Sequence, residues 1–431
     1  EPDGYHLGDT VVTVGANRLL VDGLLTMSPE LVGSGLDLEL DGPDLQRLGR
    51  LAAGLVELPD LPPEPYTVAG SIAVDATGYD VPELVVTLGH AEATISGRIG
   101  RPPDLVGTDL EIRSHGPDAA LFSSVTGVSV PVSPFNVDGQ VARTVDGFRF
   151  DDLRVRVGEH HLRLDGSLGR PPRFVGSDLD VTTEGPSLEL IAQLAGTDRL
   201  PHLAYRARGH VAVSPSRFRI EDLDAAVGGS DVRGGLSLAL DGRPRLDIDL
   251  ESAELDVAEL VRDRTDRAET VANDTPPSEP SQIEDRVFSD QPFDLEILDR
   301  FDAAASWHVA SLRLVTTTVS DIDLAASLDD GRLAIGPVDA IGEHGGRFKV
   351  SLLVEPGDDG HRIDLQVSVR GATADLTNRG RGSGRDPTTT DLVIDVSSRG
   401  RTPHEAASTA NGDVIVSLAG GEVDSSIVDL I

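Results

Sequence analysis

The sequence repeats itself at an interval of about seventy residues, and this constrains the fold more than any other feature. The stretch Gly-Arg-Pro-Pro-Asp-Leu-Val-Gly-Thr-Asp-Leu-Glu-Ile at 100–112 recurs as Gly-Arg-Pro-Pro-Arg-Phe-Val-Gly-Ser-Asp-Leu-Asp-Val at 169–181. Weaker copies lie at 29–38 and at 242–250. A repeat of this length indicates one supersecondary unit used several times.

Within each unit, hydrophobic residues alternate with polar ones. Leu246, Ile248 and Leu250 are separated by Asp247 and Asp249. This alternation predicts strands with one apolar face and one solvated face. Clusters of Gly and Pro recur about every ten residues along the chain, which is typical of antiparallel strands joined by short turns.

The pattern changes after a second marker, Gly-Pro followed by Asp or Ser, which begins at Gly42, Gly116 and Gly185. The residues that follow it carry apolar side chains at helical spacing, as in 45–55 and 188–194, and Pro favours a helix start. Both markers keep one period, so each unit should combine several strands with one short helix. We therefore expect a mainly β fold, in which repeated antiparallel strands form a long curled sheet or groove with short amphipathic helices between the repeats.

Such a sheet must cover its apolar face, and the residues alone leave two arrangements open. The helices and a folded-over sheet can fill the interior, or the sheet can curl into a trough whose lining stays available to a ligand. Aromatic residues make up only 3 % of the chain, so this face should be aliphatic. The candidate groove residues on it are Val68, Ile72, Val74, Ile95, Ile99, Leu164, Leu168, Val211, Val213, Leu236 and Leu238.

The repeats predict three regions. Residues 1–261 form the repeat region, and residues 262–286, rich in charged residues, Thr and Pro, form an acidic linker. Strand patterning resumes over 287–431, which we interpret as a C-terminal β region that is truncated. No apolar run reaches the roughly 18 residues of a membrane span, and no signal peptide is visible. We interpret the chain as a piece of a longer protein.

Charge and composition exclude several classes of protein. The net charge is −36, which disfavours binding to nucleic-acid backbones and to anionic lipid headgroups. The chain has no Cys, so it has neither disulfides nor thiolate sites. Lys349 is the only lysine among 37 basic residues, and together with the abundant Asp this suggests the hypothesis of a salt-rich habitat.

The sequence offers no convincing catalytic or metal site. His160 and His161 are adjacent, so on a strand they point to opposite faces and cannot chelate one ion. The stretch Gly380–Gly384 lacks the Lys-Ser/Thr of a phosphate-binding loop. Asp247, Asp249 and Glu251 share one strand face and suggest at most a weak calcium site, although a solvated face explains them better. We predict no enzyme activity, no cofactor and no metal.

Several further motifs follow one another along the chain. They are the repeated strand, Gly-Pro and helix unit, Val-Phe-Ser-Asp-Gln-Pro-Phe-Asp-Leu-Glu-Ile-Leu at 287–298, Leu-Asp-Asp-Gly-Arg-Leu-Ala-Ile-Gly-Pro-Val at 328–338, and Thr-Ala-Asn-Gly-Asp-Val-Ile-Val at 409–416. In this order they resemble the AsmA family of Gram-negative envelope proteins. The resemblance covers nearly the whole chain. It also connects the chain to TamB-like members of the bridge-like lipid transfer proteins.

This resemblance implies a periplasmic body, tethered by an N-terminal inner-membrane anchor that is absent from this chain. It implies a curled sheet whose apolar groove carries the acyl chains of a phospholipid or another lipid, and a role in outer-membrane lipid homeostasis and assembly. It therefore favours the trough. The alternative is a scaffold with a filled β core, which influences outer-membrane protein assembly through envelope partners. A carbohydrate-active enzyme is disfavoured because so few aromatic residues are present to form a sugar-binding platform.

Overall fold

The computed structural model describes residues 4–52, 61–123, 130–194, 196–197, 200–262, 293, 298, 300–315, 317–357, 360–374 and 388–419. The chain divides into two compact units, Glu1–Pro215 and Ser216–Ile431. The division falls inside the predicted repeat region. The predicted boundaries around the linker fall in the second unit, and residues 263–286 of that linker lie outside the described residues. The three predicted regions stay a prediction.

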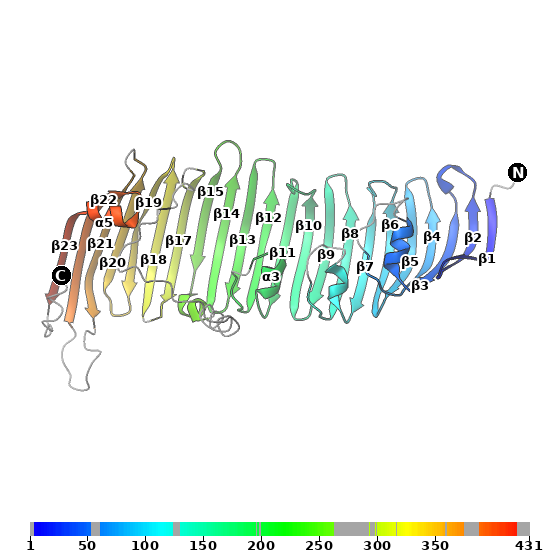
Figure 1. Ribbon diagram of the computed structural model, residues 1–431, viewed down its shortest axis with the longest axis horizontal. Coiled ribbons are helices and arrows are strands. Elements are labelled where there is room, and N and C mark those ends of the chain that lie inside the picture. The colour runs from blue at the N-terminus through cyan, green and yellow to red at the C-terminus, as the bar shows by residue number, and fades with distance from the viewer. Residues whose placement is uncertain are drawn as a thin grey trace, which may run out of the picture. The chain divides into compact units, whose positions relative to one another are not determined.

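The first unit is a meander in which each strand pairs antiparallel with the strand before it (Figure 1). Its strands are β1 Gly4–Val14, β2 Asn17–Thr26, β3 Gly35–Gly42, β4 Tyr66–Val74, β5 Gly78–Leu88, β6 Ala91–Gly100, β7 Asp109–Gly116, β8 Phe135–Arg143, β9 Gly147–Val157, β10 His160–Gly169, β11 Ser177–Gly185 and β12 Tyr205–Val213.

Short helical segments follow every fourth strand of this unit, after β3, β7 and β11. They are α1 Leu45–Ala52, the 3-10 turn η2 Ala119–Phe122 and α3 Glu189–Leu194, while a further 3-10 turn, η1 Pro29–Leu31, precedes β3. Figure 1 shows α1 and α3 lying over one face of the sheet. The third residue of the Gly-Pro marker caps each segment, because the side chains of Asp44, Asp118 and Ser187 accept hydrogen bonds from amides of the first turn. The predicted unit of strands plus one short helix is confirmed.

The glycine of the same marker makes room for an aromatic ring. Gly116 pairs with Phe135 on the next strand, and a Cβ at Gly116 would lie 2.6 Å from the ring and 2.8 Å from the side chain of Ala91. Ala91, Ala119 and Phe135 form a small core, so η2 packs on this face of the sheet. The equivalent pairs in the neighbouring repeats are Gly42 with Tyr66 and Gly185 with Tyr205. The glycine of the marker therefore pairs with an aromatic residue in all three repeats, and in the repeat of η2 this pair lies beneath the helical segment.

The second unit contains β13 Arg217–Val227, β14 Ser230–Ala239, β15 Arg245–Ser252, β16 Leu255–Asp256, β17 Asp302–Arg313, β18 Thr318–Asp329, β19 Arg332–Gly342, β20 Arg347–Glu355, β21 His361–Ala374, β22 Thr388–Gly400, α5 Pro403–Thr409 and β23 Asn411–Ala419. Its strands pair antiparallel with one exception. β15 and β16 both pair parallel with β17, and the connection from β16 to β17 includes the predicted linker. This parallel step departs from the expected antiparallel order.

Bulges bend the sheet of the first unit at regular intervals. The pairing register shifts in β1, β5 and β9, which are four strands apart. A bulge increases the local twist and bends its strand, so repeated bulges curl the sheet. The sheet stays open, and Val81 (0 % exposed) is the largest fully buried side chain among the described residues. The predicted mainly β fold of repeated strands in a curled sheet is confirmed.

Candidate functional site

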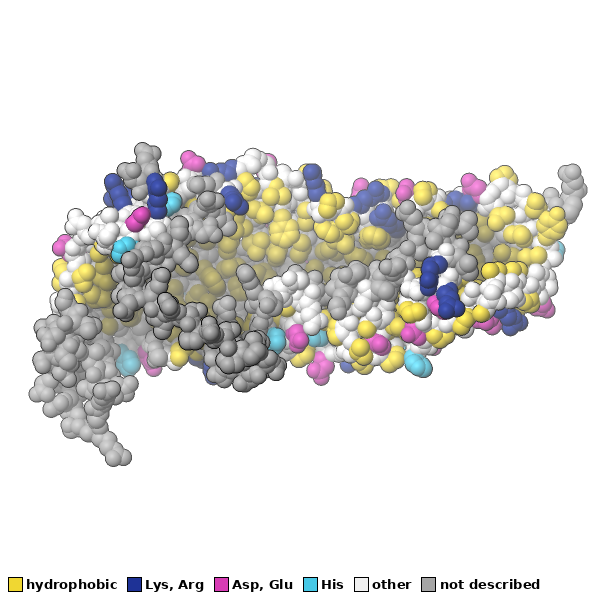
Figure 2. Space-filling view, in the orientation of Figure 1, with side chains coloured by type: hydrophobic (Ala, Val, Ile, Leu, Met, Phe, Trp, Pro, Cys, Tyr) yellow, Lys and Arg dark blue, Asp and Glu magenta, His cyan; other side chains and the backbone are white. Residues whose placement is uncertain are grey.

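The helices identify which face of each strand is apolar. η2 packs against Ala91 and Phe135, so side chains in phase with these residues share its face. We call this face of each unit the concave face and the other the convex face. Figure 2 shows yellow hydrophobic side chains lining a hollow over β10–β12. The cross-strand pairs Val68–Val86, Leu84–Ile95 and Ile95–Ile112 continue the concave face from strand to strand.

All of the predicted groove residues lie on the concave face of their unit. In the first unit they are Val68, Ile72, Val74, Ile95, Ile99, Leu164, Leu168, Val211 and Val213, and in the second unit they are Leu236 and Leu238. Val74 is buried and the others are half-buried. An aliphatic side chain that its own sheet leaves half-exposed can contact a ligand. Their role in binding lipid stays a prediction.

Carboxylates are absent from the concave positions of the strands that carry most of these residues. The concave positions of β4 are Tyr66, Val68, Gly70, Ile72 and Val74, and those of β10 are His160, Leu162, Leu164, Gly166 and Leu168. Neither set contains Asp or Glu, although the chain has 73 of them. The same holds for β6 and β12. On these four strands the concave positions are therefore mainly hydrocarbon, while Arg143 of β8 lies over the Phe148 ring at one end of the same face.

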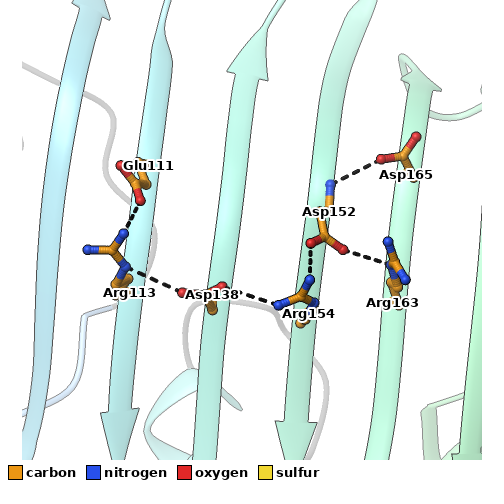
Figure 3. Close-up of polar contacts among 7 residues, drawn as sticks. All are labelled: Glu111, Arg113, Asp138, Asp152, Arg154, Arg163 and Asp165. Carbon is orange, nitrogen blue, oxygen red and sulfur yellow. Dashed lines mark hydrogen bonds and ion pairs between the residues drawn. The ribbon is translucent and has the colours of Figure 1, made fainter.

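The convex face carries the charges, and in β7–β10 they form a ladder of ion pairs (Figure 3). Arg113 Nε lies 3.5 Å from Asp138, and Asp138 lies 4.0 Å from Arg154 Nη1. Arg154 also pairs with Asp152, which lies 2.7 Å from Arg163 Nε. These side chains are exposed, so each pair stabilises the fold by about 1 kcal/mol or less. Their separation from the aliphatic residues makes the sheet two-sided.

A line of glycines lies in the middle of the concave face, and these glycines are not among the predicted groove residues. Opposite the bulge of β9, Gly166 has φ +114°, and a Cβ there would lie 2.2 Å from the carbonyl oxygen of Asp178. Gly23 and Gly97 occupy the equivalent positions opposite the bulges of β1 and β5, with φ +125° and +123°. The sequence carries a signal for them, because an apolar residue stands two positions before and two positions after each of the three glycines. At these three positions, which we call the glycine floor, the concave face is backbone, while the paired residues on the adjoining strands, such as Phe150 and Leu179 beside Gly166, carry side chains.

The histidine pair divides between the two faces as expected. His160 points to the concave side, where its Nδ1 lies 3.4 Å from the Tyr205 hydroxyl, and burial lowers its pKa. His161 lies among exposed residues of the convex side, opposite Arg156. The two rings therefore cannot hold one ion.

The carboxylates proposed as a weak calcium site lie on the polar face of β15. Asp247 pairs with Arg245 at 3.0 Å, and Asp249 accepts a hydrogen bond from Ser306. Across the described ranges, no group of three or more His, Asp or Glu side chains is placed to hold a metal ion. The glycine-rich stretch Gly380–Gly384 lies outside the described residues.

In the described part of the chain, no helix has both the length and the apolar character that crossing a membrane requires. Comparisons with protein-family models, with curated proteins and with solved structures returned no match.

Proposed function

We propose that this protein is a non-enzymatic carrier that binds the acyl chains of lipids on its concave face. One observation carries the proposal. In a chain of net charge −36, the concave positions form a half-exposed aliphatic surface from which carboxylates are missing on β4, β6, β10 and β12. Leaving such a surface in water is unfavourable, and a hydrocarbon chain is the ligand that best matches it.

The chemistry of the surface suits transport better than tight storage. Each methylene moved from water onto an apolar surface contributes about 0.8 kcal/mol, so an acyl chain gains binding energy along its whole length. The concave positions of β4, β6 and β12 carry no cation that would fix a phosphate headgroup. At the glycine floor, the strand adds no side chain of its own to the concave face. A chain held only by dispersion and the hydrophobic effect can slide.

The setting of this activity is part of the same proposal. The resemblance to AsmA proteins favours a periplasmic location, an inner-membrane tether outside this chain, and phospholipid as the cargo. The carrier would serve the lipid homeostasis of the outer membrane. Its acidic convex face would repel anionic headgroups, so the concave face would be the attractive surface for lipid.

Photocrosslinking from single positions tests the proposal. A photoreactive amino acid at Ile95 or Leu168 should crosslink to lipids that copurify with the protein, detected by mass spectrometry after extraction. The matched controls lie on the convex face: Arg113 on β7, next to the strand of Ile95, and Arg163 on β10, the strand of Leu168. We expect acyl-chain adducts at the concave positions and none at the arginines.

Two results would contradict lipid binding. If the concave positions give no lipid adduct, or if the arginines crosslink equally well, the concave face is not the binding surface. Protein adducts at Ile95 or Leu168 would instead support the scaffold alternative, in which envelope partners cover the sheet.

A further inference from the structure

Three loops of the first unit each hold a bulky apolar residue in the same unusual backbone conformation. Leu31, Leu105 and Phe174 occupy equivalent positions in successive repeats, and their φ angles are +59°, +53° and +52°. Bulky residues rarely adopt this left-handed conformation, which costs of the order of 1 kcal/mol. The three side chains are also 45 %, 42 % and 40 % exposed. The chain thus repeats an unfavourable backbone conformation at an apolar side chain that faces solvent.

Hydrogen bonds hold this conformation in place. The amide of Leu105 donates to the Arg101 carbonyl at 3.1 Å, and the Leu105 carbonyl accepts from the Thr108 hydroxyl at 2.6 Å. Phe174 has the same partners in its own loop, the Arg170 carbonyl at 2.9 Å and the Ser177 hydroxyl at 2.6 Å. Both polar backbone groups of the strained residue are satisfied, so its side chain is presented in a fixed direction.

The loops are also tied to the adjoining sheet. The amides of Gly33, Gly107 and Gly176, two residues after each strained position, donate to the carbonyls of Val74, Arg143 and Val213. The three loops are therefore rigid parts of the sheet margin.

Folding does not explain why these residues are apolar. Asn or Gly adopts a positive φ at lower cost, and 40 % or more of each side chain stays exposed, so packing accounts for only part of its apolar surface. The fourth copy of the motif shows that the strand can begin without the strained loop, because β15 begins at Arg245, directly after Gly242-Arg243-Pro244. Strain that repeats without a folding benefit points to a function of the side chain.

The three residues line one margin of the first unit. Each loop precedes β3, β7 or β11, which run in the same direction because four antiparallel pairings separate them. The loops therefore lie at the opposite strand ends from α1, η2 and α3, which follow the same strands. At about 4.8 Å per strand, successive loops stand roughly 19 Å apart. Met27, Pro102, Pro103, Pro171 and Pro172 add exposed apolar surface beside them.

We propose that Leu31, Leu105 and Phe174 form a membrane-contacting row that inserts into the interfacial region of a lipid bilayer. The spacing favours a bilayer over a protein partner. A stable protein interface buries about 800 Å² of continuous surface on each partner, whereas these contacts are single side chains separated by polar backbone. A fluid apolar phase accepts separate insertion points without matched pockets.

The net charge defines the kind of bilayer. A chain of net charge −36 is repelled by anionic headgroups, so the row contacts a zwitterionic surface best. The row lies apart from the glycine floor of the concave face, so its contact with a membrane does not require that the concave face carries lipid.

Vesicle co-sedimentation of the full chain tests the row. The test variant is the double substitution Leu105→Asn and Phe174→Asn, because Asn tolerates the positive φ and removes the apolar surface. We expect it to bind phosphatidylcholine vesicles at least about tenfold more weakly than the unsubstituted chain, since two partial insertions are lost. Its melting temperature should be unchanged or higher. The matched control is Val132→Asn, an apolar residue that is 77 % exposed outside these loops.

Each outcome decides for or against the row. Equal vesicle binding by the chain and the double variant would overturn the proposal, and so would an equal loss in Val132→Asn. A lower melting temperature for the double variant would show that the side chains serve folding. Tighter binding to anionic than to zwitterionic vesicles at low salt would contradict the charge argument. Crosslinking at Ile95 reports on the concave face independently, so the failure of one proposal is distinguishable from the failure of the other.

Discussion

Gly166 shows how a single backbone position shapes the concave face. It pairs across a register shift with the bulged strand β9, and its φ of +114° is available to glycine far more readily than to other residues. The bulge residue Asp152 itself has φ +48°, and its amide donates to the Asp165 carboxylate. One strand gains a residue, and its neighbour compensates with a glycine. The bend is thus specified by side chains and glycine together.

Replacing Gly166 by Ala should destabilise the protein strongly. The new Cβ would lie 2.2 Å from the Asp178 carbonyl, and alanine would be strained at this φ. We expect a loss of about 3 kcal/mol in the free energy of unfolding, measured by urea denaturation. The control is Gly35→Ala, where a Cβ meets nothing within 4 Å and φ is ordinary. Similar unfolding midpoints for the two variants would show that the bend does not depend on glycine.

Each short helix is an element that depends on the strands beneath it. Phe135 at the start of β8 packs edge-to-face on Phe122 of η2, with ring centroids 4.8 Å apart. The same ring contacts Ala91 and Ala119 in the small core of this repeat. Phe135 is therefore the largest buried side chain of the sheet in the cluster that η2 covers, which also includes Ala91, Val137 and Val157.

The substitution Phe135→Ala should detach η2 from the sheet. Removing a buried Phe costs about 3 to 5 kcal/mol in a closed core, and we expect the lower end here because the core is small. Urea denaturation gives the change in stability, and hydrogen exchange at Ala120 reports whether η2 opens. Phe148→Ala is the control, because Phe148 is exposed. If Phe148→Ala lowers the stability as much as Phe135→Ala does, the packing of Phe135 against η2 makes no particular contribution.

The parallel step of the second unit is held by a buried carboxylate. Asp256 in β16 accepts a hydrogen bond from the Glu259 amide at 2.8 Å and pairs with Arg313 of β17 at 2.7 Å. These contacts lower the pKa of Asp256 below its ordinary value, and the hydrogen bond from the Glu259 amide is the largest cause. Their stabilisation is fully present above the unfolded pKa of about 3.9 and is lost as the pH falls through the lower folded value.

The substitution Asp256→Asn should make the stability of the protein depend less on pH in the acid range. Asn keeps the acceptor for the Glu259 amide but loses the charge opposite Arg313. We expect the unsubstituted chain to have the higher urea midpoint at pH 7, and the difference to shrink as the pH falls below about 4. Asp104→Asn, in an exposed loop, serves as the control. A difference that stays constant down to pH 2 would contradict the linkage.

The alternation of apolar and polar residues, together with the repeat of about seventy residues, made much of the sheet predictable from the sequence. Ile95 and Leu164 were placed on the apolar face from a period of two, because strand geometry fixes the face of each residue. The parallel pairing of β15 with β17 was not predictable, since nothing in a local pattern records which strand follows a long connection. The left-handed conformation of Leu105 and Phe174 was equally hidden. The motif was visible, but a φ angle depends on hydrogen bonds such as that from Thr108, which only the folded loop reveals.

At the scale of the whole molecule, charge opposes folding. The 73 acidic residues outnumber the basic ones by 36, so even with every basic residue in an ion pair, as in the convex ladder, 36 negative charges stay uncompensated. Between 0.01 M and 1 M salt, the Debye length falls from about 30 Å to about 3 Å, so repulsion between distant carboxylates is screened.

Stability should therefore rise with salt. We expect the melting temperature to increase between 0.01 M and 1 M NaCl, because relief of the net repulsion outweighs the weakening of exposed ion pairs. Differential scanning calorimetry across this range checks the result, and an equivalent series in sucrose controls for preferential exclusion. A melting temperature that is flat or falling in NaCl would also remove the support for a salt-rich habitat.

The spacing of four strands between helices has a consequence for how such a protein can change in length. Removing or adding one strand would reverse every strand after it, and the next helix and the next strained loop would emerge at the wrong margins. A duplication of the 69-residue block from 100–168 to 169–237 adds an even number of strands and preserves every direction. The apolar face can therefore lengthen by whole repeats, in increments of roughly 19 Å. Evolution can therefore set the length of the apolar face by the number of whole repeats in the chain.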